Sequence, residues 1–206
     1  GVVVQELRTG ARSMVSARAG VNGAPAFSPD GKRLALTLSG SGGNLDIYVL
    51  DLATQALTRI TDDPAIDTEP AWSADGRQLY FTSDRSGGPQ VYRADVDAPQ
   101  RVQRLTFGSS YNARPRLSPD GRQLLVGSSD GVVRLWDVGT GKEVRCLAGL
   151  RACFAADGRV VYASRLKTGT RNVNRVRVWD ARTDEERELG RTEGVAGLVW
   201  SPAVSR

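Results

Sequence analysis

The sequence predicts an all-β fold, a β-propeller of about five blades, because one short motif recurs along the whole chain. Its copies are Phe27–Gly31 (FSPDG), Trp72–Gly76, Leu117–Gly121, Phe154–Gly158 and the truncated Trp200–Pro202. From Phe27 onward the steps are 45, 45, 37 and 46 residues. A second marker, an acid that closes an apolar run, keeps nearly the same period at Glu6, Asp51, Asp95, Asp137 and Asp180. Two parallel markers with one period of about 40–45 residues are typical of propeller blades.

Each period holds four strand-like segments, which in the first full unit are Ala24–Ser28, Arg33–Leu38, Asp46–Leu50 and Leu57–Thr61. Asp-Gly between the first two segments supplies the positive φ that a tight hairpin needs. The middle segments are almost continuously apolar, as in a sheet covered on both faces, whereas the fourth alternates with polar residues, as at an outer edge. Helical periodicity is lacking throughout, so we expect four-stranded antiparallel blades.

The two ends of the chain supply incomplete units. Complete units cover roughly residues 24–61, 69–107, 114–147 and 151–189. The chain opens with segments of the third and fourth type, Val2–Glu6 and Ser13–Ala17, and closes with one of the first type, Val195–Ser201. We therefore expect one domain over residues 1–206, a monomeric ring whose last, three-stranded blade is shared between the N- and C-termini. The alternative is a homodimer in which two chains exchange strands.

Composition excludes several kinds of chemistry. The chain has no histidine, which removes Ser-His-Asp and Cys-His catalysis and histidine-based zinc sites. Two cysteines, Cys146 and Cys153, are too few for a disulfide scaffold, and we expect both to be small core side chains. We assign no catalytic, metal-binding or cofactor-binding residue. The net charge of +5 comes from scattered arginines, which leaves weak nucleic-acid binding as an alternative function.

Residues 1–126 resemble the TolB-like β-propeller family. The resemblance rests on GVNGAPAFSPDGKRLALTLS, DIYVLDLATQALTRITDDPAIDTEPAWSADGRQLYFTSDRSGGPQVYRADV and RLTFGSSYNARPRLSPDGRQL. It implies a periplasmic, non-enzymatic protein that binds a peptidoglycan-associated lipoprotein or a peptide at the mouth of the central channel.

Residues 128–201 are instead similar to WD40 repeats, and the WD40-like part of the domain covers residues 127–206. This similarity rests on SSDGVVRLWDVGTGKEVRCL and NRVRVWDARTDEERELG. The Gly-His pair and the histidine-containing tetrad of WD40 blades are missing. The change of pattern suggests an engineered chimera of propeller fragments, a protein-interaction scaffold without a strong native ligand that would be expressed in the cytoplasm. The alternative is a natural propeller whose blades diverged.

The candidate partner-binding surface lies at the channel mouth, in the loops that lead into each first strand, at Gly20–Pro25, Ile66–Pro70, Tyr111–Pro115 and Gly149–Arg151. Carried over position by position, the TolB-like resemblance implies that the binding residues are Asn22, Asp67, Thr68, Glu69, Tyr111, Asn112 and Arg114. The alternative is that these polar side chains satisfy turn backbones. We interpret Asp137 and Asp180 as turn caps rather than metal ligands. We expect the tryptophans to pack between blades.

Overall fold

The computed structural model describes residues 1–193 except residues 41, 150 and 169–170, and its regular elements there are strands, without a helix. The first sheet pairs β1 (Val2–Gln5) with β2 (Arg12–Ser16). The second contains β3 (Asn22–Phe27), β4 (Arg33–Ser39), β5 (Leu45–Asp51) and β6 (Leu57–Arg59). The third contains β7 (Asp67–Trp72), β8 (Gln78–Ser83), β9 (Gln90–Asp95) and β10 (Val102–Arg104).

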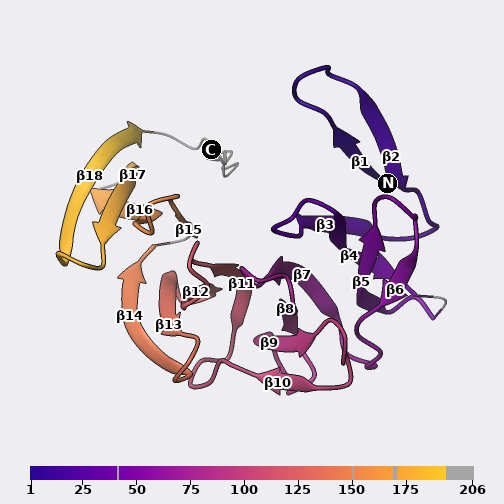
Figure 1. The fold of residues 1–206 in the computed structure, drawn as a ribbon. Helices are drawn as coiled ribbons and strands as arrows, with labels where there is room; N and C mark the ends of the chain where they lie inside the picture. The colour runs from indigo at the N-terminus through magenta and orange to yellow at the C-terminus, as the bar shows by residue number, and fades with distance from the viewer. Residues whose placement is uncertain (41, 150, 169–170, 194–206) are drawn as a thin grey trace. The chain divides into compact units, whose positions relative to one another are not determined.

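Two further sheets follow along the chain. One contains β11 (Asn112–Leu117), β12 (Gln123–Ser128), β13 (Val132–Asp137) and β14 (Lys142–Ala148). The other contains β15 (Arg151–Phe154), β16 (Val160–Thr168), β17 (Arg171–Asp180) and β18 (Glu185–Glu193). Figure 1 shows the strands of each sheet following one another in chain order. The fold is thus a β-propeller, and four complete four-stranded blades lie among the described residues, as the repeat predicts.

The predicted N-terminal pair of strands is confirmed, because β1 and β2 form an antiparallel pair. The blade predicted to be shared between the termini depends on Val195–Ser201, which lies outside the described residues. The chain divides into two compact units, residues 1–115 (unit 1) and residues 116–206 (unit 2), with the boundary inside β11. A single domain over residues 1–206 therefore stays a prediction.

Burial follows the position of a strand in its blade. In β4 the side chains from Leu34 to Leu38 are all buried, and β8 has the same pattern from Leu79 to Ser83. The fourth strands β6 and β10 are three residues long and carry no fully buried residue. This gradient confirms that apolar middle segments are covered on both faces while the polar fourth segment forms an outer edge.

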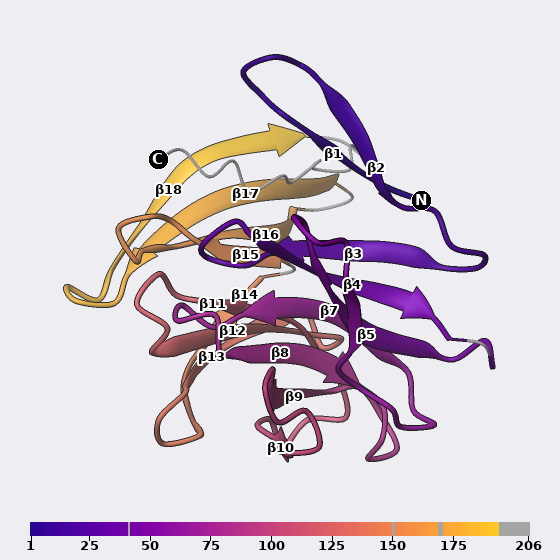
Figure 2. The same cartoon turned by 45° about the vertical axis from the view of Figure 1, so that its right-hand side comes forward.

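We number the four-stranded blades in chain order, so that the first is β3–β6, the second β7–β10 and the third β11–β14. The contact between the first and second blades is centred on Trp72. β7 lies beside β3 and β4, and Figures 1 and 2 agree on this arrangement. The indole N–H of Trp72 donates a 2.9 Å hydrogen bond to the carbonyl of Ala26 in the neighbouring blade. The guanidinium of Arg33 lies 4.7 Å from the centre of the Trp72 ring and donates to the carbonyl of Gly76 at 2.8 Å. The predicted inter-blade role of Trp72 is thus confirmed.

Unit 2 has a core of its own, which is formed by Leu125, Val133, Leu135, Leu147, Val160, Tyr162 and Trp179. The prediction of two core cysteines is wrong for Cys146, which is exposed, whereas Cys153 is half-buried. Side chains alternate between the two faces of a strand, and in β14 the buried position belongs to Leu147. Its neighbour Cys146 therefore points to the exposed face, opposite Arg134 in the strand pairing.

We predict that Trp72→Ala lowers the free energy of unfolding by about 3–5 kcal/mol, since it removes a buried aromatic side chain from between two blades. Phe27→Ala is the matched control, because Phe27 holds the equivalent repeat position but is 52% exposed, against 8% for Trp72. We expect the control to cost about 1 kcal/mol or less. Urea denaturation of both variants measures the difference, and equal losses would contradict the assignment of Trp72 to the inter-blade contact.

Candidate functional site

The candidate site is the leading end of unit 1, which we define as the residues around the starts of β3, β7 and β11. These strands begin at Asn22, Asp67 and Asn112, one repeat of 45 residues apart. The expectation that the residues up to Pro25, Pro70 and Pro115 form loops is wrong. Each strand begins three residues before its proline, so that among the predicted site residues Tyr111 alone precedes its strand.

Each of β3, β7 and β11 continues through its proline because a single residue with positive φ interrupts the regular strand geometry without ending the strand. Ala24, Glu69 and Arg114 have φ angles of 46°, 58° and 59°, and each immediately precedes a proline. The pairing of β3 with β4 shifts register between Gly23 and Ala26, and β7 with β8 shifts at the equivalent place. A residue in the left-handed region within a strand is typical of a β-bulge, which changes the direction of neighbouring side chains.

Asn22 and Asn112 hold the backbone at the starts of their strands. The Asn22 carboxamide accepts from the Ser16 hydroxyl at 2.6 Å and donates to the carbonyls of Arg18 and Gly20. Asn112 is fully buried, and its carboxamide donates to Gln90 Oε1 at 3.0 Å. Both side chains thus fix the path of the chain where it enters a blade.

Asp67 occupies the equivalent place in the second blade and forms a buried ion pair. Its carboxylate oxygens accept two hydrogen bonds from Arg85 Nη2, at 2.9 and 3.0 Å. Burial raises the pKa of Asp67 above its ordinary value, and hydrogen bonding with Ser83 and the charge of Arg85 oppose that rise. The sequence does not reveal the role of Arg85, because this residue and Asp67 are 18 positions apart and belong to different strand ends.

Glu69 and Arg114 form a more exposed pair across the boundary between two blades. Arg114 Nε donates to Glu69 Oε1 at 3.1 Å, and the side chains are 57% and 30% exposed, respectively. Thr68, which precedes Glu69, is half-buried. The structure therefore brings Glu69 and Arg114 together, although 45 residues separate them in the sequence.

Three exposed apolar side chains precede the three strands. Val21 and Ile66 are each 48% exposed and Tyr111 is 37% exposed, one at each repeat-equivalent position. Two of these backbones are held by side chains: Val21 N–H donates to Ser39 Oγ and Ile66 N–H donates to Asp84 Oδ1, both at 2.8 Å. We name these three residues the apolar row. Sequence reasoning missed Val21 and Ile66, although stepping back one repeat at a time from Tyr111 would have found them.

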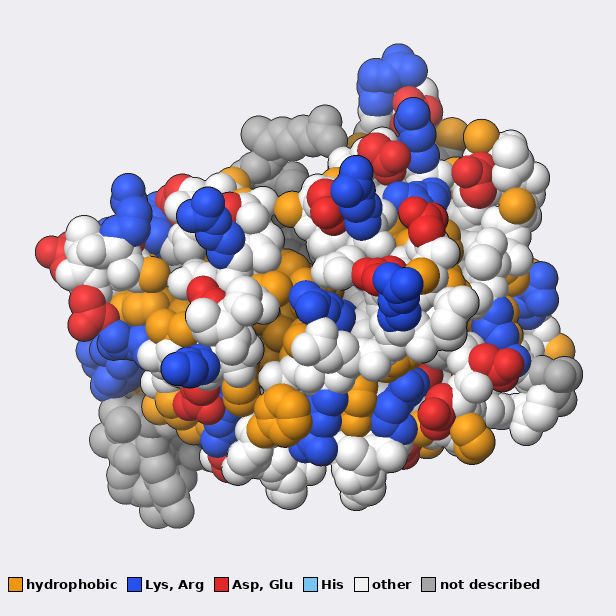
Figure 3. Space-filling view, turned by 60° about the horizontal axis from the view of Figure 1, so that its bottom comes forward, with side chains coloured by type: hydrophobic (Ala, Val, Ile, Leu, Met, Phe, Trp, Pro, Cys, Tyr) orange, Lys and Arg blue, Asp and Glu red, His pale blue; other side chains and the backbone are white. Residues whose placement is uncertain are grey.

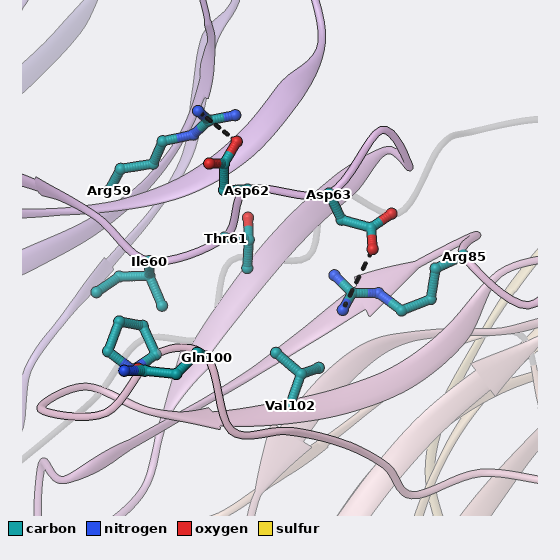
Figure 4. Close-up of a pocket in the computed structure, with 9 residues that line it drawn as sticks. Arg59, Ile60, Thr61, Asp62, Asp63, Arg85, Gln100 and Val102 are labelled. Atoms are coloured by element: carbon teal, nitrogen blue, oxygen red, sulfur yellow. Dashed lines mark ion pairs between the residues drawn. The ribbon is translucent and has the colours of Figure 1, made fainter.

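A pocket of about 550 Å³ lies elsewhere in unit 1, beyond the ends of β6 and β8 (Figure 4). Its lining residues are Arg59, Ile60, Thr61, Asp62, Asp63, Arg85, Pro99, Gln100 and Val102. Arg59 pairs with Asp62 at 2.6 Å and with the buried Asp46 at 2.7 Å. Arg85 is similarly held by Asp67. Because the chain's own carboxylates engage both guanidinium groups, this pocket is less suited to an anionic ligand than its two arginines suggest.

Asp137 and Asp180 cap the turns that follow their strands, as expected. Asp137 Oδ1 accepts from the Thr140 amide at 2.7 Å, and Asp180 Oδ1 accepts from the Arg182 amide at 2.9 Å. Within residues 1–193, leaving out the gaps, the structure contains no cluster of three metal-ligating side chains and no helix that could cross a membrane. On the face drawn in Figure 3, Lys and Arg side chains are interspersed with Asp and Glu rather than gathered into one broad patch.

Comparison with known proteins gives one consistent family. The model of the TolB beta propeller domain matches residues 1–204. The Tol-Pal system protein TolB of Alcanivorax borkumensis is 52% identical over 42 residues, which are 20% of this chain and 10% of that protein. The same-named protein of Francisella tularensis subsp. holarctica is 43% identical over 54 residues, 26% of this chain and 12% of that protein.

A solved relative extends the match over most of the chain. The crystal structure of TolB from Acinetobacter baumannii is similar with a TM-score of 0.72 and 40% identity. The similarity covers 84% of this chain and 45% of that one, so this chain spans less than half of the solved TolB.

We predict that Arg85→Met lowers the free energy of unfolding by about 3–5 kcal/mol at neutral pH, because it leaves the Asp67 carboxylate buried without its positively charged partner. Arg114→Met, the matched control, removes a largely exposed partner and should cost less than about 1 kcal/mol. Urea denaturation at neutral pH compares the two variants.

The loss in Arg85→Met should also depend on pH. Without Arg85 the pKa of Asp67 rises further, so the native carboxyl keeps its proton after the unfolded one, with an ordinary value of 3.8, has lost it. Stability of the variant therefore falls as the pH rises above that value. A loss that is the same at acidic and neutral pH would contradict a buried ion pair.

Proposed function

We propose, from the premise that this chain belongs to the TolB β-propeller domain family, that it is a non-enzymatic scaffold which binds a protein or peptide at the leading end of unit 1. The observation that carries this proposal is the apolar row. Equivalent positions before three successive first strands present exposed apolar side chains, of which one is aromatic, and the backbones of Val21 and Ile66 are held by hydrogen bonds. Rigid, exposed apolar groups with a polar surround are typical of protein-binding surfaces.

The predicted site residues divide into two roles in this proposal. Tyr111, Arg114 and Thr68 retain exposed surface and would contact the partner together with Val21 and Ile66. A second group, Asn22, Asp67 and Asn112, would act by holding the strand starts in place. Glu69 shares features of both groups, because its carboxylate is partly exposed and is also paired with Arg114.

The non-enzymatic assignment is supported by the state of the acids at the leading end. Hydrolysis by a pair of carboxylates requires both groups to face a substrate. Asp67 is fully buried against Arg85, and Glu69 accepts hydrogen bonds from the next blade. The arrangement favours a binding surface over an acid–base pair.

The partner we propose is the peptidoglycan-associated lipoprotein, or a peptide that competes with it, in the periplasm. The support is that the relatives carry the name Tol-Pal system protein TolB. Because the chain spans less than half of the solved TolB, the surface would be incomplete and the affinity low.

We also propose that the chain is an engineered chimera, in which residues 128–201 are WD40-like. Its support is a change in repeat chemistry: Gly127 stands where earlier blades have Thr37 and Thr82, and the proline before the marker is lost after Pro115. A single family model over residues 1–204 favours the alternative of one diverged natural propeller. A natural reading frame that encodes residues 1–206 contiguously would refute the chimera.

We predict that the chain is a monomer, since a ring shared between the termini needs no second copy. Light scattering should give a mass near 22.1 kDa. A particle of twice that mass would instead support the strand-exchanged homodimer.

The proposed function predicts weak binding of the soluble domain of the lipoprotein, with a dissociation constant above about 1 μM. In an NMR titration, shifts should concentrate at the leading end of unit 1. Replacing the apolar row by serine should abolish them, whereas the control Val144→Ser with Leu189→Ser, two exposed apolar residues of unit 2, should not. Shifts that survive loss of the apolar row, or binding tighter than micromolar, would contradict the proposal.

A further inference from the structure

We infer that Glu69 is a positioning residue, which holds the start of β11 in the binding arrangement through a relay that joins three successive blades. The relay consists of Thr37, Glu69, Thr82 and Arg114. Its consequence for binding rests on the proposed function, whereas the relay itself rests on the contacts below.

The first step of the relay is made by backbone amides. Glu69 N–H in β7 donates to the hydroxyl of Thr37 in β4 at 3.3 Å. Arg114 N–H in β11 donates to the hydroxyl of Thr82 in β8 at 3.1 Å. Both threonines are buried and stand one repeat of 45 residues apart, as do Glu69 and Arg114. The same contact thus ties the first strand of one blade to the second strand of the blade before it.

The second step is made by the Glu69 carboxylate. Its Oε2 accepts from the Thr82 hydroxyl and from the Arg114 amide, each at 3.0 Å. Its Oε1 accepts from Arg114 Nε at 3.1 Å. One side chain therefore fixes the hydroxyl that holds Arg114, the backbone of Arg114 and its guanidinium. Hydrogen bonds to a charged acceptor are stronger than those between neutral groups.

The backbone at these positions needs such support. Glu69 and Arg114 have φ angles of 58° and 59° although neither is glycine, and each precedes a proline. This conformation is unfavourable for a residue other than glycine and persists where surrounding contacts determine it. Ala24 has the same conformation at φ 46° but no side-chain group that could form the relay. The carboxylate at Glu69 is therefore what distinguishes the junction between the second and third blades.

The relay orients residues that the proposed function uses. Arg114 is largely exposed, and Tyr111 lies three residues before it, at the end of the apolar row. The hydrogen bond from Nε to Glu69 restricts the positions open to the Arg114 guanidinium, in the same short segment as Tyr111. Glu69 then contributes to binding by holding Arg114 and the start of β11, which Tyr111 precedes, rather than by contacting the partner.

Amide hydrogen exchange of the full chain, followed by NMR, tests this inference. In Glu69→Gln and in Thr82→Val we expect the Arg114 amide to exchange at least about tenfold faster, with the amides of β9 unchanged. Thr82→Ser keeps the hydroxyl and should restore slow exchange. Thr37→Val is the matched control, because it should speed the exchange of the Glu69 amide but leave that of Arg114 slow.

The outcomes separate this inference from the proposed function. Unchanged exchange at Arg114 in both Glu69→Gln and Thr82→Val would overturn the relay, whatever happens to binding. Loss of lipoprotein binding in Glu69→Gln but not in Thr82→Val would show that Glu69 contacts the partner, and would overturn the positioning role. Faster exchange of the Arg114 amide in both variants supports the relay. If the lipoprotein does not bind the unaltered chain, the proposed function fails but the relay stands.

Discussion

The packing of one blade against the next is the constraint on which the structure of unit 1 depends. A four-stranded sheet of about 40 residues cannot bury both of its apolar faces alone, so its stability comes from its neighbours. Trp72 supplies this contact by filling the space beside the first blade while its indole N–H satisfies the Ala26 carbonyl. Arg33 covers the other side of the ring and joins the two Asp-Gly hairpins.

The packing of the blades determines the geometry of the leading end of unit 1. Within unit 1, residues one repeat apart come close enough to pair, as Glu69 does with Arg114. The polar side chains at the strand starts then hold the backbone, and the apolar residues before them remain exposed. At each strand start, a polar side chain that holds the backbone thus directly follows an exposed apolar residue.

The repeat made the architecture predictable, because period, hairpin turns and apolar middle strands each follow from local sequence. The roles of individual side chains at the leading end of unit 1 could not be predicted in the same way. The left-handed conformation of Glu69, and hence the early start of β7, depends on contacts with Thr37 in another blade. Likewise the pairing of Asp67 with Arg85 is a tertiary contact that no local pattern encodes. The exposure of Cys146 follows from which residues of β14 face the core, and composition cannot specify that.

The most direct test of interlocked blades is the exchange rate of the Trp72 indole proton, which can be assigned by its loss in Trp72→Phe. If this proton is bonded to Ala26 in the neighbouring blade, it should exchange at least about a thousandfold more slowly than that of free tryptophan. Exchange at the free rate, while the backbone amides of β8 stay protected, would show folded blades without the contact between them and would contradict this account.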